Sequence, residues 1–171
     1  SMATGEVPLQ LQAALQAIAD EPAVVSLRDV HGDNLIWRAD KDGLRRIGLL
    51  DFQDALLLPD GYDLASLVDD PRRIVPDDLR RAAIAAYARV RGATEAGMSY
   101  RVALLSLLRN LRILGIFRRL STEAGRPAYT RFQPRTRALI ARAAGHPGLA
   151  ALRHPVTELL RLTEDWQDVA A

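Results

Sequence analysis

The sequence predicts an α+β fold that is mainly helical, in which short strands near the amino terminus carry acidic loops and pack on a helical bundle. Two observations lead to this prediction. Short apolar runs rich in Val, Ile and Leu occur between residues 23 and 52, which is typical of strands. From Tyr62 onward, apolar residues recur with a period of about 3.6, which indicates helices.

Helices are predicted at the start of the chain and through its second half. The first runs from Leu9 to Ile18, where apolar side chains recur at helical spacing, and Asp20-Glu21-Pro22 ends the pattern. Proline and glycine residues divide the later periodic segment. The helices predicted there cover 62–69, 77–91, 99–121, 134–144 and 155–167, and 121–133 is predicted as a surface connection.

Three short strands are predicted between the leading helix and the helical bundle. They cover 23–27, 34–38 and 47–52. Asp42-Gly43 lies between the last two and can supply the positive φ of a hairpin tip. Lys41, the single lysine, is therefore expected in solvent, and the other basic residues are all arginines.

The composition limits both location and chemistry. The 171 residues carry a net charge of +2 and are 49% hydrophobic and 26% charged, which suits one domain or one lobe of a larger enzyme. Cysteine is absent, which excludes disulfides, thiol catalysis and cysteine-ligated zinc. With no long apolar run and no secretory signal, we expect a cytoplasmic protein without a membrane partner. Ser1-Met2 is interpreted as a tag scar.

Two acidic loops follow the predicted strands, and their carboxylates are expected to converge. The loops are Arg28-Asp29-Val30-His31-Gly32-Asp33-Asn34 and Leu49-Leu50-Asp51-Phe52-Gln53-Asp54. Phosphoryl transfer needs a carboxylate to deprotonate an alcohol, and an amide oxygen with a second carboxylate to hold Mg²⁺ against nucleotide phosphates. Asp29, Asn34 and Asp51 can fill these roles.

These loops resemble the protein-kinase-like fold. Asp29 and Asn34 have the Asp-x-x-x-x-Asn spacing of its catalytic loop, and Asp51-Phe52-Gln53 resembles its Asp-Phe-Gly turn. The likeness covers about residues 23–153 and includes the segments Leu49-Leu50-Asp51-Phe52-Gln53-Asp54-Ala55, Gly61-Tyr62-Asp63-Leu64-Ala65-Ser66-Leu67 and Arg109-Asn110-Leu111-Arg112-Ile113-Leu114-Gly115-Ile116-Phe117. It is similar to bacterial amino-sugar kinases of the aminoglycoside phosphotransferase family, which phosphorylate N-acetylmuramate and N-acetylglucosamine at the anomeric hydroxyl.

The resemblance implies an ATP-dependent sugar kinase with Mg²⁺ as its metal. Asp29 would be the catalytic base, and Asn34 and Asp51 the magnesium ligands. The expected partners are a small sugar, either an amino sugar or an aminoglycoside, and a nucleotide. Weaker candidates for binding the substrate are His31, Asp54 and Arg109.

A second interpretation of the first loop makes Asp33 the base, because His31-Gly32-Asp33 looks like the His-Gly-Asp of aminoglycoside phosphotransferases. The residue five positions after Asp33 is Arg38, whereas Asn34 stands five after Asp29, so we favour Asp29. Leu27 stands where many relatives have histidine.

The amino-terminal nucleotide-binding lobe of such kinases is expected to be missing. That lobe carries a loop over the phosphates and a strand lysine, yet the residues before Ala23 contain one glycine and no lysine. We therefore expect residues 1–22 to form the tag scar and leading helix, and 23–171 a carboxy-terminal catalytic and substrate lobe. The 171-residue chain by itself is expected to be nearly inactive.

Structural roles remain open for several of these residues. Asp63 is expected to cap a helix beginning at Leu64, and His31 can instead be a neutral histidine bonded to a backbone carbonyl. Trp37 and Phe52 are expected in the core.

The arginines of the long helix have two interpretations. They can form a solvated stripe, or Arg109 and Asn110 can turn toward the cleft and bind an acyl or carboxylate group of a sugar. The acidic pairs Asp69-Asp70 and Asp77-Asp78 could face the same cleft.

A rival function is a degenerate kinase lobe that binds a protein or nucleic acid through its arginines. Nucleic acid is not expected, because acidic residues nearly balance basic ones and aromatic residues make up only 5% of the chain.

Overall fold

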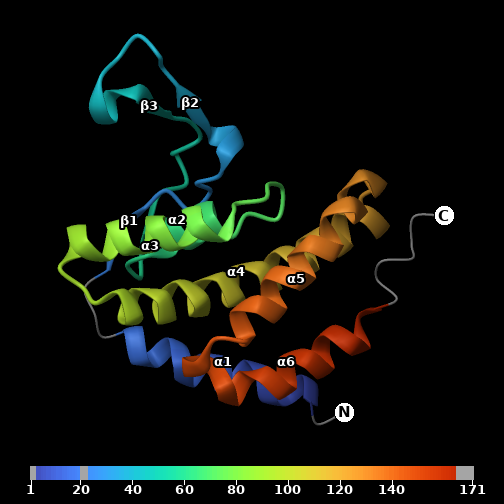
Figure 1. Ribbon diagram of the computed structural model, residues 1–171. Helices are drawn as coiled ribbons and strands as arrows, with labels where there is room; N and C mark the ends of the chain where they lie inside the picture. The colour runs from blue at the N-terminus through green and yellow to red at the C-terminus, as the bar shows by residue number, and fades with distance from the viewer. Residues whose placement is uncertain (1–2, 20–22, 165–171) are drawn as a thin grey trace.

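The computed structural model describes residues 3–19 and 23–164 (Figure 1). Its helices are α1 Ala3–Ala19, α2 Tyr62–Val68, α3 Asp77–Arg91, α4 Glu95–Thr122, α5 Gln133–Ala144 and α6 Ala150–Leu162. Its strands are β1 Val24–Ser26, β2 Leu35–Trp37, β3 Ile47–Leu49 and β4 Leu56–Leu58. Short 3₁₀ turns connect them, including η1 Gly32–Asn34 and η3 Pro127–Phe132. The mainly helical α+β class predicted from the sequence is confirmed.

The long helix α4 is the centre of the fold. Helices α2, α3 and α5 pack against it, and α1 pairs with α6 on another side (Figure 1). The α4 residues Leu104, Leu105 and Leu107 are almost fully buried, which requires neighbours on more than one face of the helix. Leu11 and Ile18 of α1 join the same core, so the leading helix is part of this unit. Within the described residues, no helix combines the length and the apolar character that spanning a membrane would require.

The strands form two separate antiparallel pairs. β1 pairs with β4, with Val24 opposite Leu58, and β2 pairs with β3, with Leu35 opposite Leu49. The β2–β3 hairpin projects away from the helices (Figure 1). Gly43 near its tip has φ 55°, and Lys41 is exposed, as the sequence predicted.

Several elements differ from the prediction. Helix α1 starts at Ala3 rather than at Leu9, α4 starts at Glu95 rather than at residue 99, and β3 ends at Leu49 rather than at Phe52. β4 was not predicted, because a run of three leucines carries no alternation and becomes a strand only through pairing with β1. The last helix starts at Ala150 rather than at Pro155, which lies inside α6 and is buried against the core. Burial of the proline ring offsets the lost backbone hydrogen bond. The predicted helix end at 165–167 and the break at Asp20-Glu21-Pro22 lie outside the described residues.

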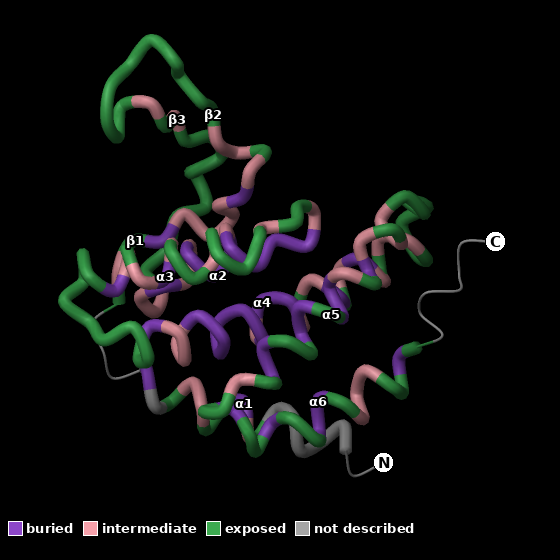
Figure 2. The backbone as a smooth tube through the Cα atoms, in the orientation of Figure 1, coloured by how far each residue is buried: buried purple, intermediate pink, exposed green. Residues whose placement is uncertain are grey.

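The prediction that Trp37 and Phe52 are core residues is wrong. Trp37 is 63% exposed and Phe52 62% exposed. Both lie on or beside the β2–β3 hairpin, which is exposed over most of its length, whereas residues 102–110 of α4 are mostly buried (Figure 2). No described helix packs over this hairpin, so its apolar side chains have no core to enter.

Three of the four acidic residues at positions 69–70 and 77–78 form ion pairs within the fold. The buried Asp69 carboxylate pairs with Arg80 of α3 at 2.9 Å and with Arg142 of α5. Arg142 also pairs with Asp77 at 3.2 Å. Asp69 therefore ties three elements together.

A partly buried tyrosine joins α3 to the turn before α2, and we expect it to make stability fall at alkaline pH. Tyr87 donates a 2.5 Å hydrogen bond to Asp60, which also pairs with Arg91 at 2.8 Å. Burial and the bond to Asp60 raise the pKa of Tyr87 to about 12. An unfolded tyrosine releases its proton near pH ~10. Between pH ~10 and about 12 the folded chain still holds this proton and the unfolded chain has lost it, so the free energy of unfolding falls as pH rises through this range.

Urea unfolding at pH 8 and at pH 11 measures this effect. The Tyr87→Phe variant has no proton to release here, so its free energy of unfolding should drop less between the two pH values than that of the unmodified chain. Equal drops in the two proteins would contradict the assignment.

Candidate active site

One cavity collects most of the residues that the sequence singled out. It has a volume of about 260 Å³ and lies between the two acidic loops, the start of α2 and the middle of α4. Its lining residues are Arg28, Asp29, Asp51, Asp54, Tyr62, Arg72, Arg109, Arg112, Ile113, Ile116 and Phe117. The aspartates come from the loops, and the apolar side chains come from α4.

Asp63 fixes the loop that carries Asp29. Its carboxylate accepts hydrogen bonds from Ser26 Oγ at 2.6 Å, from the Leu27 amide at 2.7 Å and from the Arg28 amide at 3.0 Å. Asp63 lies in the first turn of α2, where Gly61 occupies the capping position, so it does not cap that helix. Asp63 therefore has a structural role, as expected, but it holds residues 26–28 in place rather than the end of α2.

The backbone is strained at the two places where the candidate groups are presented. Among the described residues, Arg28 and Asp51 are the non-glycine residues with positive φ, at 69° and 56°. This conformation costs about 1 to 3 kcal/mol for an ordinary side chain, and it persists only where the surroundings hold it. At Arg28 the bonds to Asp63 supply that restraint.

His31 lies behind Asp29 and is not part of the cavity lining. Its Nδ1 accepts a hydrogen bond from the Asp33 amide at 3.2 Å, whereas the structural role expected for His31 was donation to a backbone carbonyl. In the neutral ring the proton is then on Nε2, which is 3.4 Å from Asp29 Oδ2. The buried imidazole therefore orients the Asp29 carboxylate rather than reaching a ligand.

Asn34 and Asp51 lie at one end of the β2–β3 hairpin. The Leu50 amide donates to the Asn34 carbonyl at 2.9 Å, which joins the two loops directly. Asn34 Nδ2 donates to the Asp29 carbonyl at 3.0 Å, so the amide oxygen of Asn34 is left for another partner. Asp51 is exposed and accepts a hydrogen bond from Gln53.

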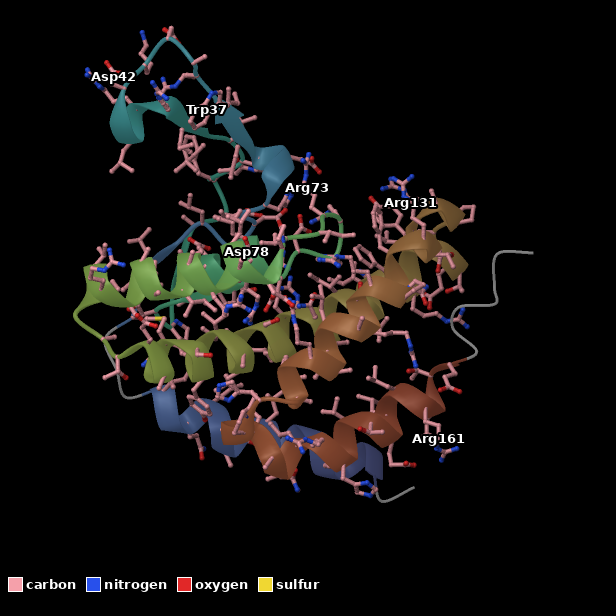
Figure 3. The ribbon with its side chains drawn as sticks, in the orientation of Figure 1. Trp37, Asp42, Arg73, Asp78, Arg131 and Arg161 are labelled. Atoms are coloured by element: carbon pink, nitrogen blue, oxygen red, sulfur yellow. The ribbon has the colours of Figure 1, made fainter. Side chains whose placement is uncertain are left out.

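Asp33 has a different environment from Asp29. Its carboxylate pairs with Arg73 of the loop after α2, and the hydrogen bond from Arg73 lowers the pKa of Asp33. Arg73 also covers Gly32, where an added Cβ would come within 2.7 Å of its side chain. Figure 3 shows Arg73 at the base of the hairpin, which carries Trp37 and Asp42. Asp33 does not line the cavity.

Both interpretations of the α4 arginines hold for part of the set: some of these side chains line the cavity, and others face solvent. Arg109 is 4% exposed and lines the cavity, whereas Arg112 lines it from an exposed position and Arg119 is exposed outside it. Asn110 does not reach the cavity, because its buried amide donates to the carbonyls of Ser106 at 3.0 Å and Asp69 at 3.4 Å.

Comparison with known proteins decides the family. The sequence profile of the phosphotransferase enzyme family (APH) matches residues 4–100. The chain belongs to this phosphotransferase family. It is also 39% identical over 132 residues to an N-acetylmuramate/N-acetylglucosamine kinase of Caulobacter vibrioides. That match covers 74% of this chain and 35% of the relative, so the chain spans about a third of the relative's length.

Several lining residues of this phosphotransferase chain were not singled out from the sequence. Tyr62 is the first residue of α2, and Arg72 lies in the loop after that helix. Phe117 lines the cavity from α4 and packs against Tyr129 and Phe132 of η3, with ring centres 5.5 Å and 5.4 Å apart. Ile113 and Ile116 follow Arg109 at helical spacing, which is the one signal that could have placed them on the same face. Asp54, a weak candidate, does line the cavity.

Proposed function

We propose that this chain is the carboxy-terminal lobe of a kinase with the protein-kinase-like fold, which transfers the γ-phosphoryl group of ATP to a sugar hydroxyl. The observation that carries the proposal is the convergence of Asp29 and Asp51 on one cavity, with Asn34 bonded to the Asp29 backbone. The chemistry of the family and the name of the Caulobacter relative support a sugar as the acceptor.

Asp29 is the base in this proposal. Its carboxylate faces the cavity, is held by Asp63 through the loop backbone, and is half exposed, so an acceptor hydroxyl can reach it. The acceptor oxygen forms a bond to the γ-phosphorus, the bond to the ADP oxygen breaks, and the hydroxyl proton passes to Asp29. Positioning is most of the catalysis in such a reaction.

The residues present fit a magnesium ion. The amide oxygen of Asn34 makes no hydrogen bond within the described residues, and Asp51 offers an exposed carboxylate at the same hairpin end. Such hard oxygen ligands suit Mg²⁺, which usually takes one or two carboxylates and completes its coordination with waters and phosphates. Within 3–19 and 23–164, no group of three or more His, Cys, Asp or Glu side chains is placed to hold a metal. When bound, the ion would neutralise charge on the transferred phosphoryl group.

The lining charges favour an amino sugar such as N-acetylmuramate or N-acetylglucosamine over an aminoglycoside. Four arginines and three aspartates line the cavity, and Asp29 and Asp51 are assigned to the base and the metal. A polycationic aminoglycoside would instead need additional carboxylates. The nearby acidic residues Asp69 and Asp77 are already paired with arginines.

An amino-terminal lobe is proposed to cover the strands. The β1–β4 and β2–β3 pairs expose a group of large apolar side chains on the same part of the molecule. These are Val25, Ile36, Trp37, Ile47, Leu49, Leu50, Phe52, Leu56 and Leu57. Apolar patches of this kind mark interaction surfaces. The relative is about three times as long as the matched segment, which leaves ample sequence for such a lobe.

Phosphorus NMR with Mg-ATP and a panel of N-acetylated amino sugars and aminoglycosides tests the function. A polypeptide that includes the upstream lobe should give a new phosphomonoester signal with an amino sugar, and the 171-residue chain alone should give none. Turnover by the short chain alone would contradict the missing lobe. No signal with any sugar would contradict the kinase and leave the rival, a binding module.

A further inference from the structure

The cavity contains a buried cation with an unused hydrogen-bond donor. Arg109 is 4% exposed, and its Nη1 has no hydrogen-bond partner among the described residues. Burial lowers the pKa of Arg109, which reflects the cost of keeping this charge out of water. Its nearest carboxylate is that of Asp29, where Nη2 and Oδ1 are 3.7 Å apart, too far for a hydrogen bond.

A second guanidinium nitrogen in the same cavity is also unsatisfied. Nη1 of Arg72 is buried without a hydrogen bond in the described part of the chain, and it is 3.6 Å from Asp70 Oδ1. Arg72 and Arg109 come from different elements, the loop after α2 and the middle of α4, yet both line the one cavity. Neither nitrogen makes a hydrogen bond within the described residues, and an anionic ligand in the cavity would supply the missing acceptors, because native proteins rarely leave buried donors without one.

We propose that Arg109 and Arg72 bind a carboxylate on the acceptor, so that the cavity selects sugars bearing an acidic substituent over their uncharged counterparts. The inference rests on the proposed sugar kinase function and adds the residues that set its specificity. A guanidinium presents its donors in a planar fork that matches the two oxygens of a carboxylate.

The dimensions of the site restrict where that carboxylate sits on the acceptor. Arg109 is next to Asp29, so the acidic group and the reacting hydroxyl must lie within about one sugar ring of each other. Ile113 and Ile116 continue the wall from Arg109 and offer apolar contact to ring carbons or to an acyl methyl group. N-acetylmuramate meets these conditions through its lactyl ether, which is the group that N-acetylglucosamine lacks.

Isothermal titration of the 171-residue chain with N-acetylmuramate, N-acetylglucosamine and kanamycin tests the inference without requiring catalysis. We expect N-acetylmuramate to bind about tenfold or more tightly than N-acetylglucosamine, as one charge-assisted contact implies, and kanamycin to bind most weakly. Equal affinities for the two amino sugars, or no binding of N-acetylmuramate, would overturn the inference.

Matched variants of α4 locate the preference. Arg109→Lys keeps the charge but removes the planar fork and should erase most of the preference for N-acetylmuramate. Arg119→Lys, on the exposed part of the same helix, should retain it. Thermal unfolding of each variant verifies that the fold is intact, and a preference that survives Arg109→Lys in a folded protein would contradict the assignment.

The two proposals fail in different ways. Selective binding of N-acetylmuramate without phosphoryl transfer by the longer polypeptide would contradict the kinase function and support the carboxylate site. Phosphoryl transfer to both amino sugars, with equal affinity for each, would support the kinase and contradict the carboxylate site.

Discussion

Replacing Asp29 by Asn should lower kcat of the polypeptide that includes the upstream lobe by about 10²- to 10⁴-fold. The amide keeps the shape of the side chain but does not accept the hydroxyl proton. Because the Asp29 carboxylate is half exposed and makes only long contacts to His31 and Arg109, the fold should be retained. Steady-state phosphoryl transfer, with circular dichroism as a check on folding, measures both effects.

Asp33→Asn is the matched control in the same loop. Asp33 points to Arg73 at the surface rather than into the cavity, so its replacement should change kcat by less than about tenfold, since exposed ion pairs contribute little. This pair of variants separates the two interpretations of the first acidic loop. If Asp33→Asn were the more damaging change, the base would have to be Asp33.

Replacing Asp63 by Ala should lower the free energy of unfolding by about 2 to 4 kcal/mol and remove most activity, although Asp63 does not line the cavity. The change deprives Ser26, Leu27 and Arg28 of their common acceptor, and a buried donor without a partner is costly. It also removes the restraint on the strained Arg28, so Asp29 loses its fixed position. Urea unfolding and kcat together measure the effect.

Asp42→Ala on the hairpin is the control for this change. The Asp42 side chain is 90% exposed and its pair with Arg46 is 3.6 Å long, so its loss should alter stability by less than about 0.5 kcal/mol. Figure 3 shows Asp42 near the hairpin tip, far from the helical core. A small effect of Asp63→Ala, similar to that of Asp42→Ala, would mean that the loop is held by other contacts.

The sequence was informative wherever the signal is local. The hydrophobic period placed α3 at its observed bounds, and Asp42-Gly43 identified the hairpin tip, because helix periodicity and turn chemistry depend on neighbouring residues. The spacing of Asp29, Asn34 and Asp51 likewise predicted loops that the fold does bring together.

The sequence was less informative where the outcome depends on distant partners. β4 exists because β1 lies beside it, and Asp63 acts on a loop more than thirty residues away. The burial of Arg109 follows from the packing of α4, which periodicity alone does not orient because this helix is apolar on several faces. Trp37 was misplaced because residue type indicates a preference for burial but supplies no neighbour to bury against.

The two parts of the candidate site are attached to the helical core in different ways. Asp29 is fixed through Asp63 to a helix that packs in the core, whereas Asn34 and Asp51 belong to a two-stranded ribbon with no described helix behind it. Under the proposed function, Asp29 receives the sugar hydroxyl, and Asn34 and Asp51 hold the metal beside the phosphates. We therefore expect the position of Asp29 to change less on binding than the positions of Asn34 and Asp51, because fewer contacts restrain the hairpin.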